Sequence, residues 1–175
     1  MSRVKLVALS ATLAPIFKQG YHPGHIGRIV ELHGTYYSKH WGSGATFEIL
    51  MAAELAEFCE RYDPERDLLL TAHVDNKLIG SVAVHGSDAD DGTARLRWFI
   101  VDEAYQGQGI GRALLEQALM FCREKACLNL YLWTVDELPQ ARHLYESVGF
   151  RVVEQVRDSR YGVLLLSLKL EITLA

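Results

Sequence analysis

The chain has 175 residues, which is the length of a single domain. Hydrophobic residues make up 49% and charged residues 23% of the sequence, and this balance excludes an intrinsically disordered chain. The formal net charge is −4 and the lysines and arginines are not clustered, which argues against a nucleic-acid-binding protein.

The sequence predicts one domain over residues 1–175, in which residues 1–14 form an N-terminal extension or part of a first strand. No apolar run reaches the roughly 18 residues that cross a bilayer, so we expect no membrane span. Cys59, Cys122 and Cys127 lack metal-ligand spacing, which indicates reduced thiols in a cytoplasmic protein. The seven histidines show no such spacing either, and we expect no metal ion.

Hydrophobic spacing and turn residues predict the secondary structure in chain order. Glu54 is the polar exception on the apolar face of the second predicted helix. The alternation of element types implies an α+β or mixed α/β fold, with helices on the faces of one sheet. The predicted elements are a strand within 6–20, helices at 25–41 and 46–62, strands at 68–74, 78–84 and 94–101, a helix at 109–125, a strand at 128–135, a helix at 138–148, and strands at 150–157 and 163–172.

The predicted strand at 94–101 carries two arginines in an otherwise apolar segment. Simple alternation sets Leu96, Trp98 and Ile100 on one face, and Arg95, Arg97 and Phe99 on the other. Two interpretations of the arginines stay open. They line a substrate cleft, where they would favour a carboxylate-bearing amine, or they belong to a solvated strand face.

Residues 106–111 connect this strand to the next helix, and three of the five residues from Gly107 to Gly111 are glycine. A glycine backbone can approach a ligand closely. The first N–H groups of a helix lack internal partners, and the helix dipole is positive at that end. The loop and the helix therefore form an anion site, to which Arg112 adds a cation.

The glycine spacing narrows the choice of anion. The dinucleotide-binding pattern G-x-G-x-x-G fails from either starting glycine, and the Gly-Lys-Ser/Thr of a P-loop is absent. The pattern Q/R-x-x-G-x-G/A fits at Gln106, Gly109 and Gly111. This is the pyrophosphate-binding motif of the GNAT superfamily of N-acetyltransferases, which the chain resembles.

The resemblance extends beyond the loop. Ala141, Leu144, Tyr145, Gly149 and Phe150 match the family's A-x-x-L-Y-x-x-x-G-F segment. The asparagine that often stands three residues before the alanine is a leucine here. Segments from residue 20 onward are similar to the acetyltransferase domain that is often fused to MarR-type regulators. The winged-helix domain of those proteins is absent from this sequence, so a direct DNA role does not carry over.

The resemblance implies a GNAT fold, which is a mixed, mostly antiparallel sheet splayed between its fourth and fifth strands with helices on both faces. It implies acetyl transfer from acetyl-CoA, as co-substrate, to a primary amine on a small molecule or a protein, through a tetrahedral intermediate. No nucleic acid, membrane or metal is expected, and dimers are common in the family. The coenzyme-binding residues that it implies are Phe99, Ile100, Val101, Gln106, Gly107, Gln108, Gly109, Ile110, Gly111 and Arg112.

Within that family Tyr145 occupies the position of the general acid, and a backbone N–H near Ile100 or Val101 serves the oxyanion. No general base follows from the sequence, because the family's glutamate aligns with Arg95. Candidates elsewhere are Glu48, His73, His85 and Asp136, or an ordered water. Two alternatives to an enzyme stay open, a non-catalytic acyl-CoA sensor and an interaction protein with an empty cleft.

Overall fold

The computed structural model describes residues 14–86, 91–159 and 162–174. In this part of the chain seven strands form one sheet in the order β1-β2-β3-β4-β5-β7-β6. Neighbouring strands are antiparallel except β4 and β5, which are parallel. The strands are β1 (Ile16–Gln19), β2 (Leu68–Val74), β3 (Lys77–Gly86), β4 (Thr93–Val101), β5 (Asn129–Val135), β6 (Arg151–Asp158) and β7 (Leu165–Thr173).

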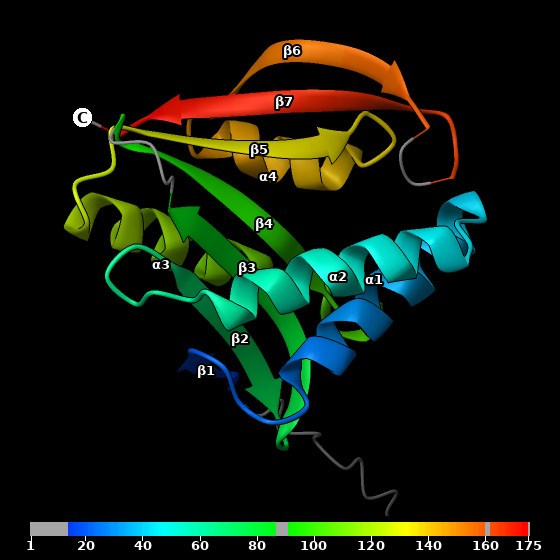
Figure 1. The fold of residues 1–175 in the computed structure, drawn as a ribbon, viewed down its shortest axis with the longest axis horizontal. Coiled ribbons are helices and arrows are strands. Elements are labelled where there is room, and N and C mark those ends of the chain that lie inside the picture. The colour runs from blue at the N-terminus through cyan, green and yellow to red at the C-terminus, as the bar shows by residue number, and fades with distance from the viewer. Residues whose placement is uncertain (1–13, 87–90, 160–161, 175) are drawn as a thin grey trace, which may run out of the picture.

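Helices cover both faces of this sheet (Figure 1). Two pack on one face through a core that includes Ile29, Leu55 and Trp98, and two pack on the other through a core that includes Leu114 and Tyr145. The first pair is α1 (His25–Trp41) and α2 (Ala45–Glu60), and the second pair is α3 (Ile110–Glu124) and α4 (Pro139–Ser147).

The predicted fold is confirmed, including a sheet that opens between its fourth and fifth strands. The predicted first strand is β1, while residues 1–13 of the predicted extension lie outside the described residues. The predicted hairpin between β2 and β3 turns on Asp75 and Asn76, whose φ angles of 49° and 62° match a tight two-residue turn. None of the described helices is long and apolar enough to cross a bilayer.

β4 and β5 lie side by side only where they begin. Their pairing runs from Thr93 opposite Asn129 to Arg95 opposite Tyr131. Beyond this point β4 keeps its pairing with β3 and β5 keeps its pairing with β7. Figure 1 shows the two strands diverging along their length. The backbone edge of β4 after Arg95 is consequently left without a strand partner on this side.

A β-bulge at Trp98 reverses the faces of β4. Between Ser81 and Ala83 of β3, the partner positions on β4 step from Ile100 to Arg97, so β4 has one extra residue. The bulged position is Trp98, whose backbone is in the left-handed conformation with a φ of 46°. The buried hydroxyl of Ser81 donates a hydrogen bond of 2.7 Å to the Trp98 carbonyl and holds the bulge in place.

The bulge makes the predicted alternation wrong. Leu96 packs in the core beneath α3, whereas Trp98 and Ile100 pack in the core beneath α1 and α2. Phe99 packs toward α3. In a regular strand it would lie on the same face as Arg95, because the two positions are four residues apart. The inserted residue shifts the alternation by one, which moves every later side chain to the opposite face.

We predict that Ser81→Ala lowers the free energy of unfolding by about 1–2 kcal/mol, because the buried Trp98 carbonyl loses its donor. Denaturant unfolding measures the change. Ser43→Ala is the matched control, since the Ser43 hydroxyl is buried without a hydrogen-bond partner among the described residues, and it should unfold like the wild type or be more stable. Equal stability of the two variants would contradict a clamping role for Ser81.

Candidate active site

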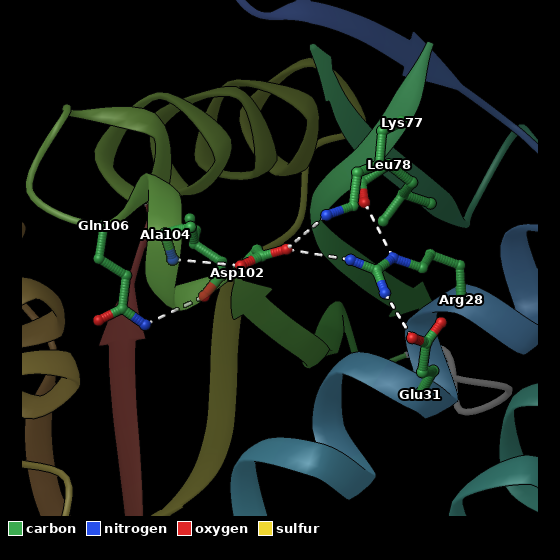
Figure 2. A network of polar contacts seen from close by, with 8 residues as sticks. Arg28, Glu31, Lys77, Leu78, Asp102, Ala104 and Gln106 are labelled. Atoms are coloured by element: carbon green, nitrogen blue, oxygen red, sulfur yellow. Dashed lines mark hydrogen bonds and ion pairs between the residues drawn. The ribbon is translucent and has the colours of Figure 1, made fainter. Parts of the chain in front are cut away.

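The segment that follows β4 is fixed by its own side chains. Asp102 caps the short 3₁₀ turn η1 (Glu103–Tyr105), and its Oδ1 accepts a hydrogen bond of 3.1 Å from the Ala104 N–H. The Gln106 side chain donates a 3.0 Å hydrogen bond back to the Val101 carbonyl. Figure 2 shows both contacts, which stabilise a tight turn of the chain before the glycine-rich loop begins.

Asp102 also joins this segment to α1 and β3 (Figure 2). Its Oδ2 lies 3.0 Å from Nη2 of Arg28 and 3.3 Å from Nζ of Lys77. The same guanidinium donates through Nε to the Leu78 carbonyl at 3.2 Å and contacts Glu31 at 2.8 Å. A network of this kind fixes the loop relative to the sheet more firmly than one exposed ion pair would.

The glycine-rich loop presents unpaired N–H groups at the start of α3. Gly107 and Gly109 have φ angles of 73° and 81°, and a Cβ at either position would meet no atom within 4 Å. The first helical hydrogen bond runs from the Ala113 N–H to the Gly109 carbonyl. The preceding N–H groups therefore have no intrahelical acceptor, and the backbone here is open to an anionic ligand.

A cavity of about 330 Å³, here called the loop cavity, lies between this loop, β4 and α4. Arg112 lines it at one end and donates a 3.2 Å hydrogen bond to the Ser147 hydroxyl. Gln108 does not line the cavity; its side chain lies 3.5 Å from the Ala104 carbonyl. The predicted coenzyme-binding residues that do line it are Phe99, Ile100, Val101, Gln106, Gly107, Gly109, Ile110, Gly111 and Arg112.

A second cavity of about 150 Å³, here called the strand cavity, lies where β4 and β5 separate. Its walls come from α1, α2, β4, β5, α4 and β7. Four residues line both cavities, namely Tyr37, Phe99, Leu138 and Ala141. The loop cavity and the strand cavity therefore meet at the opening in the sheet, so two ligands could approach each other there from different sides.

Tyr145 lies beside this meeting point, in contact with Phe99. This tyrosine is only 5% exposed, and its ring centroid lies 5.6 Å from that of Phe99. Burial, with a smaller contribution from Tyr37, raises the pKa of the Tyr145 hydroxyl far above its ordinary value. Tyr145 is among the residues that line the strand cavity. The raised pKa keeps the Tyr145 hydroxyl protonated at physiological pH.

The strand cavity also contains charged side chains. Arg97 forms an ion pair with Glu54 of α2, and its guanidinium carbon lies 4.1 Å from the centre of the Trp98 ring. Glu54 was not among the predicted general bases, although its polar side chain on an apolar helix face was a signal that could have found it. His33, also buried here, hydrogen-bonds through Nδ1 to the Ile29 carbonyl, and burial lowers its pKa to about 4.

The four candidate bases taken from the sequence lie elsewhere, and none lines either cavity. Asp136 pairs with Arg142 at 2.8 Å, and the Glu48 side chain packs against Gly34 of α1. His73 hydrogen-bonds to Thr71 within β2, and the His85 ring packs edge-to-face against Phe58. Of the described residues, no group of three or more His, Cys, Asp or Glu is arranged to hold a metal ion.

Curated relatives of this chain are acetyltransferases. An N-acetylaspartate synthetase of Xenopus tropicalis is 35% identical over 82 residues, which are 47% of this chain and 30% of that protein. An acetyltransferase of Agrobacterium fabrum is 34% identical over 102 residues, which are 58% of this chain and 69% of that protein. The chain therefore spans about a third of the length of the synthetases that it matches.

Solved structures share the fold. A Salmonella typhimurium structure that contains acetyl-CoA superposes with a TM-score of 0.70 at 17% identity, over 93% of this chain and 95% of that one. A spermidine N-acetyltransferase from Vibrio cholerae superposes with a TM-score of 0.67 at 20% identity, over 91% and 95%. The acetyltransferase (GNAT) family model matches residues 26–150, which is more than half of the sequence. This chain therefore belongs to the GNAT family of acetyltransferases.

Proposed function

We propose that this protein transfers the acetyl group of acetyl-CoA to a primary amine by direct attack of the amine on the thioester. The observation that carries the proposal is the junction of the two cavities at the opening between β4 and β5, with Tyr145 beside it. The loop cavity takes the coenzyme and the strand cavity takes the acceptor. The narrower similarity to domains fused to MarR-type regulators stays a prediction.

The loop cavity suits the coenzyme in charge and in shape. The unpaired N–H groups that precede Ala113 and the cation of Arg112 complement a pyrophosphate. The edge of β4 after Arg95 has no strand partner, so its N–H and C=O groups can bind the extended, amide-containing arm of the coenzyme. An N–H near Ile100 or Val101 then lies where the oxyanion of the intermediate would need a donor.

The reaction needs two proton movements. The amine lone pair attacks the thioester carbon, the carbonyl electrons move onto oxygen, and their return breaks the carbon–sulfur bond. Tyr145 donates its proton to the departing thiolate, and the proton that the nitrogen loses as the amide forms restores the Tyr145 hydroxyl. A thiol titrates near ~8.5 and tyrosine near ~10 in water, so this transfer is uphill. Desolvation raises the pKa of the thiol as well as that of the phenol, which limits the difference.

The amine must also be neutral before it attacks. Glu54 is the one carboxylate among the described residues that line the strand cavity. It keeps an ion pair with Arg97, and it can accept the proton of the entering ammonium group directly or through one water. We assign it the role of general base.

Coenzyme binding and thiol release together test the proposed function. Calorimetry should detect coenzyme A binding, and a thiol-release assay should detect turnover with at least one amine from a panel of amino acids, polyamines and peptides. Binding without release above background for every amine would instead identify an acyl-CoA sensor. Absence of binding would indicate an interaction protein with an empty cleft.

We predict that Tyr145→Phe lowers kcat by about 10²-fold or more, because a positioned general acid contributes at least that much. The affinity for coenzyme A should stay within about 2-fold, since the ring and its packing remain. Because the pKa of Tyr145 is raised, its acid form persists at alkaline pH, so wild-type kcat should not fall between pH 8 and about pH 10. Tyr62→Phe, which alters a tyrosine lining neither cavity, is the control and should keep wild-type kcat.

We predict that Glu54→Gln lowers kcat/KM for an α-amino acceptor by about 10-fold at pH 7, because only the roughly one tenth of the amine that is already neutral in solution can then react. An α-amino group has a pKa near ~8, so the deficit should shrink above about pH 9, where solution supplies the neutral amine. Parallel pH profiles of kcat/KM measure this recovery. Glu48→Gln on the same helix is the control, and a deficit of Glu54→Gln that is constant with pH would contradict the base role.

A further inference from the structure

The side chains that line the strand cavity carry more positive than negative charge. Its described charged lining residues are two arginines, Arg95 and Arg97, and one carboxylate, Glu54. Glu54 and Arg97 neutralise each other through their ion pair. His33 adds no charge at neutral pH, because burial lowers its pKa to about 4. Among the described lining residues, one positive charge, that of Arg95, is left unbalanced in the cavity proposed to receive an amine.

Arg95 has no anionic partner among the described residues. Its Nε is fully buried and makes no hydrogen bond, and its guanidinium carbon lies 5.9 Å from the centre of the Tyr131 ring. Burying a guanidinium N–H without an acceptor costs free energy, so such a group marks the position of a missing acceptor. The neighbouring Arg97 differs because its charge is already balanced by Glu54.

The position of Arg95 suits an amine substrate that binds the arginine at one end and reaches the thioester with the other. Arg95 is the last residue of β4 that pairs with β5, opposite Tyr131, so it lies where the opening begins. Phe99 lies further along β4, where the two cavities meet, and the Tyr145 ring packs against it. A ligand anion on Arg95 would leave the other end of a short molecule pointing along the opening toward the thioester.

We propose that the acceptor is a small amine that carries a carboxylate, such as an amino acid, and that Arg95 binds this carboxylate. The inference rests on the function proposed above. A planar guanidinium matches a carboxylate through paired hydrogen bonds, which makes arginine the suitable cation. The volume of about 150 Å³ is below the roughly 300–1,000 Å³ of pockets for drug-sized ligands, which suits a metabolite. A polyamine would place further positive charge beside Arg95 and is disfavoured.

The experiment compares acceptors that differ only in the carboxylate. Initial rates of thiol release are measured for a set of amino acids, for their carboxamides and for their decarboxylated amines, with acetyl-CoA saturating. Amino acids should exceed both analogues by about 10-fold or more in kcat/KM, as expected for a charge-assisted pair of hydrogen bonds. An equal or higher kcat/KM for the carboxamides would overturn the inference while leaving the acetyltransferase function intact.

Variants identify the residue responsible. Arg95→Ala should lower kcat/KM for the amino acids by about 10- to 100-fold, mostly through KM, and bring it close to that of the carboxamides. Its KM for acetyl-CoA should be unchanged. Arg95→Lys should recover only part of the preference, because a lysine keeps the charge but not the paired geometry. Arg151→Ala, which removes an exposed strand arginine away from both cavities, should behave as wild type.

Two outcomes separate the inference from the function on which it rests. If wild-type protein binds coenzyme A but releases thiol with no amine, the proposed function itself fails. If the protein turns over and Arg95→Ala keeps the full preference for carboxylates, the assignment of Arg95 fails alone. Should Arg95→Ala not fold, as judged by circular dichroism and coenzyme A affinity, the loss of preference in Arg95→Lys decides the matter.

Discussion

The candidate site depends on the early end of the pairing between β4 and β5. The two strands share three residue pairs and then follow different neighbours, β3 and β7. Backbone N–H and C=O groups without a strand partner need another hydrogen-bond partner. The edge of β4 that faces β5 beyond Arg95 can therefore bind a ligand through its backbone. Both cavities meet at this opening, which places the proposed coenzyme site next to the proposed acceptor site.

The bulge at Trp98 gives the two sides of the opening different chemistry. Before the bulge, Arg95 and Arg97 face the strand cavity beneath α1 and α2, and after it Phe99 and Val101 pack toward α3 and α4. A regular strand would have kept the arginines and Phe99 on one face. The extra residue therefore places the two arginines and Phe99 on opposite faces of β4, and the Ser81 hydroxyl holds this bulge through its hydrogen bond to the Trp98 carbonyl.

Much of this arrangement could be predicted from the sequence. Element order, the glycine-rich loop and the opening of the sheet followed from local spacing and from one family motif. The bulge could not be predicted, because it depends on Ser81, which is 17 residues away from Trp98. Glu54 was visible as a polar exception, but only the packing of α2 against β4 brings it to Arg97. The coenzyme contact predicted for Gln108 from its place in the motif stays a prediction, since Gln108 does not line the loop cavity.

A crystal structure of the protein with coenzyme A and an acetylated amino acid would test this account most directly. We predict that the sulfur atom lies between β4 and β5, within hydrogen-bond reach of the Tyr145 hydroxyl, at about 3–3.5 Å. The carboxylate of the product should contact the Arg95 guanidinium at about 2.7–2.9 Å. A sulfur atom outside the opening, with Tyr145 facing only protein, would contradict the central claim that the opening is the reaction site.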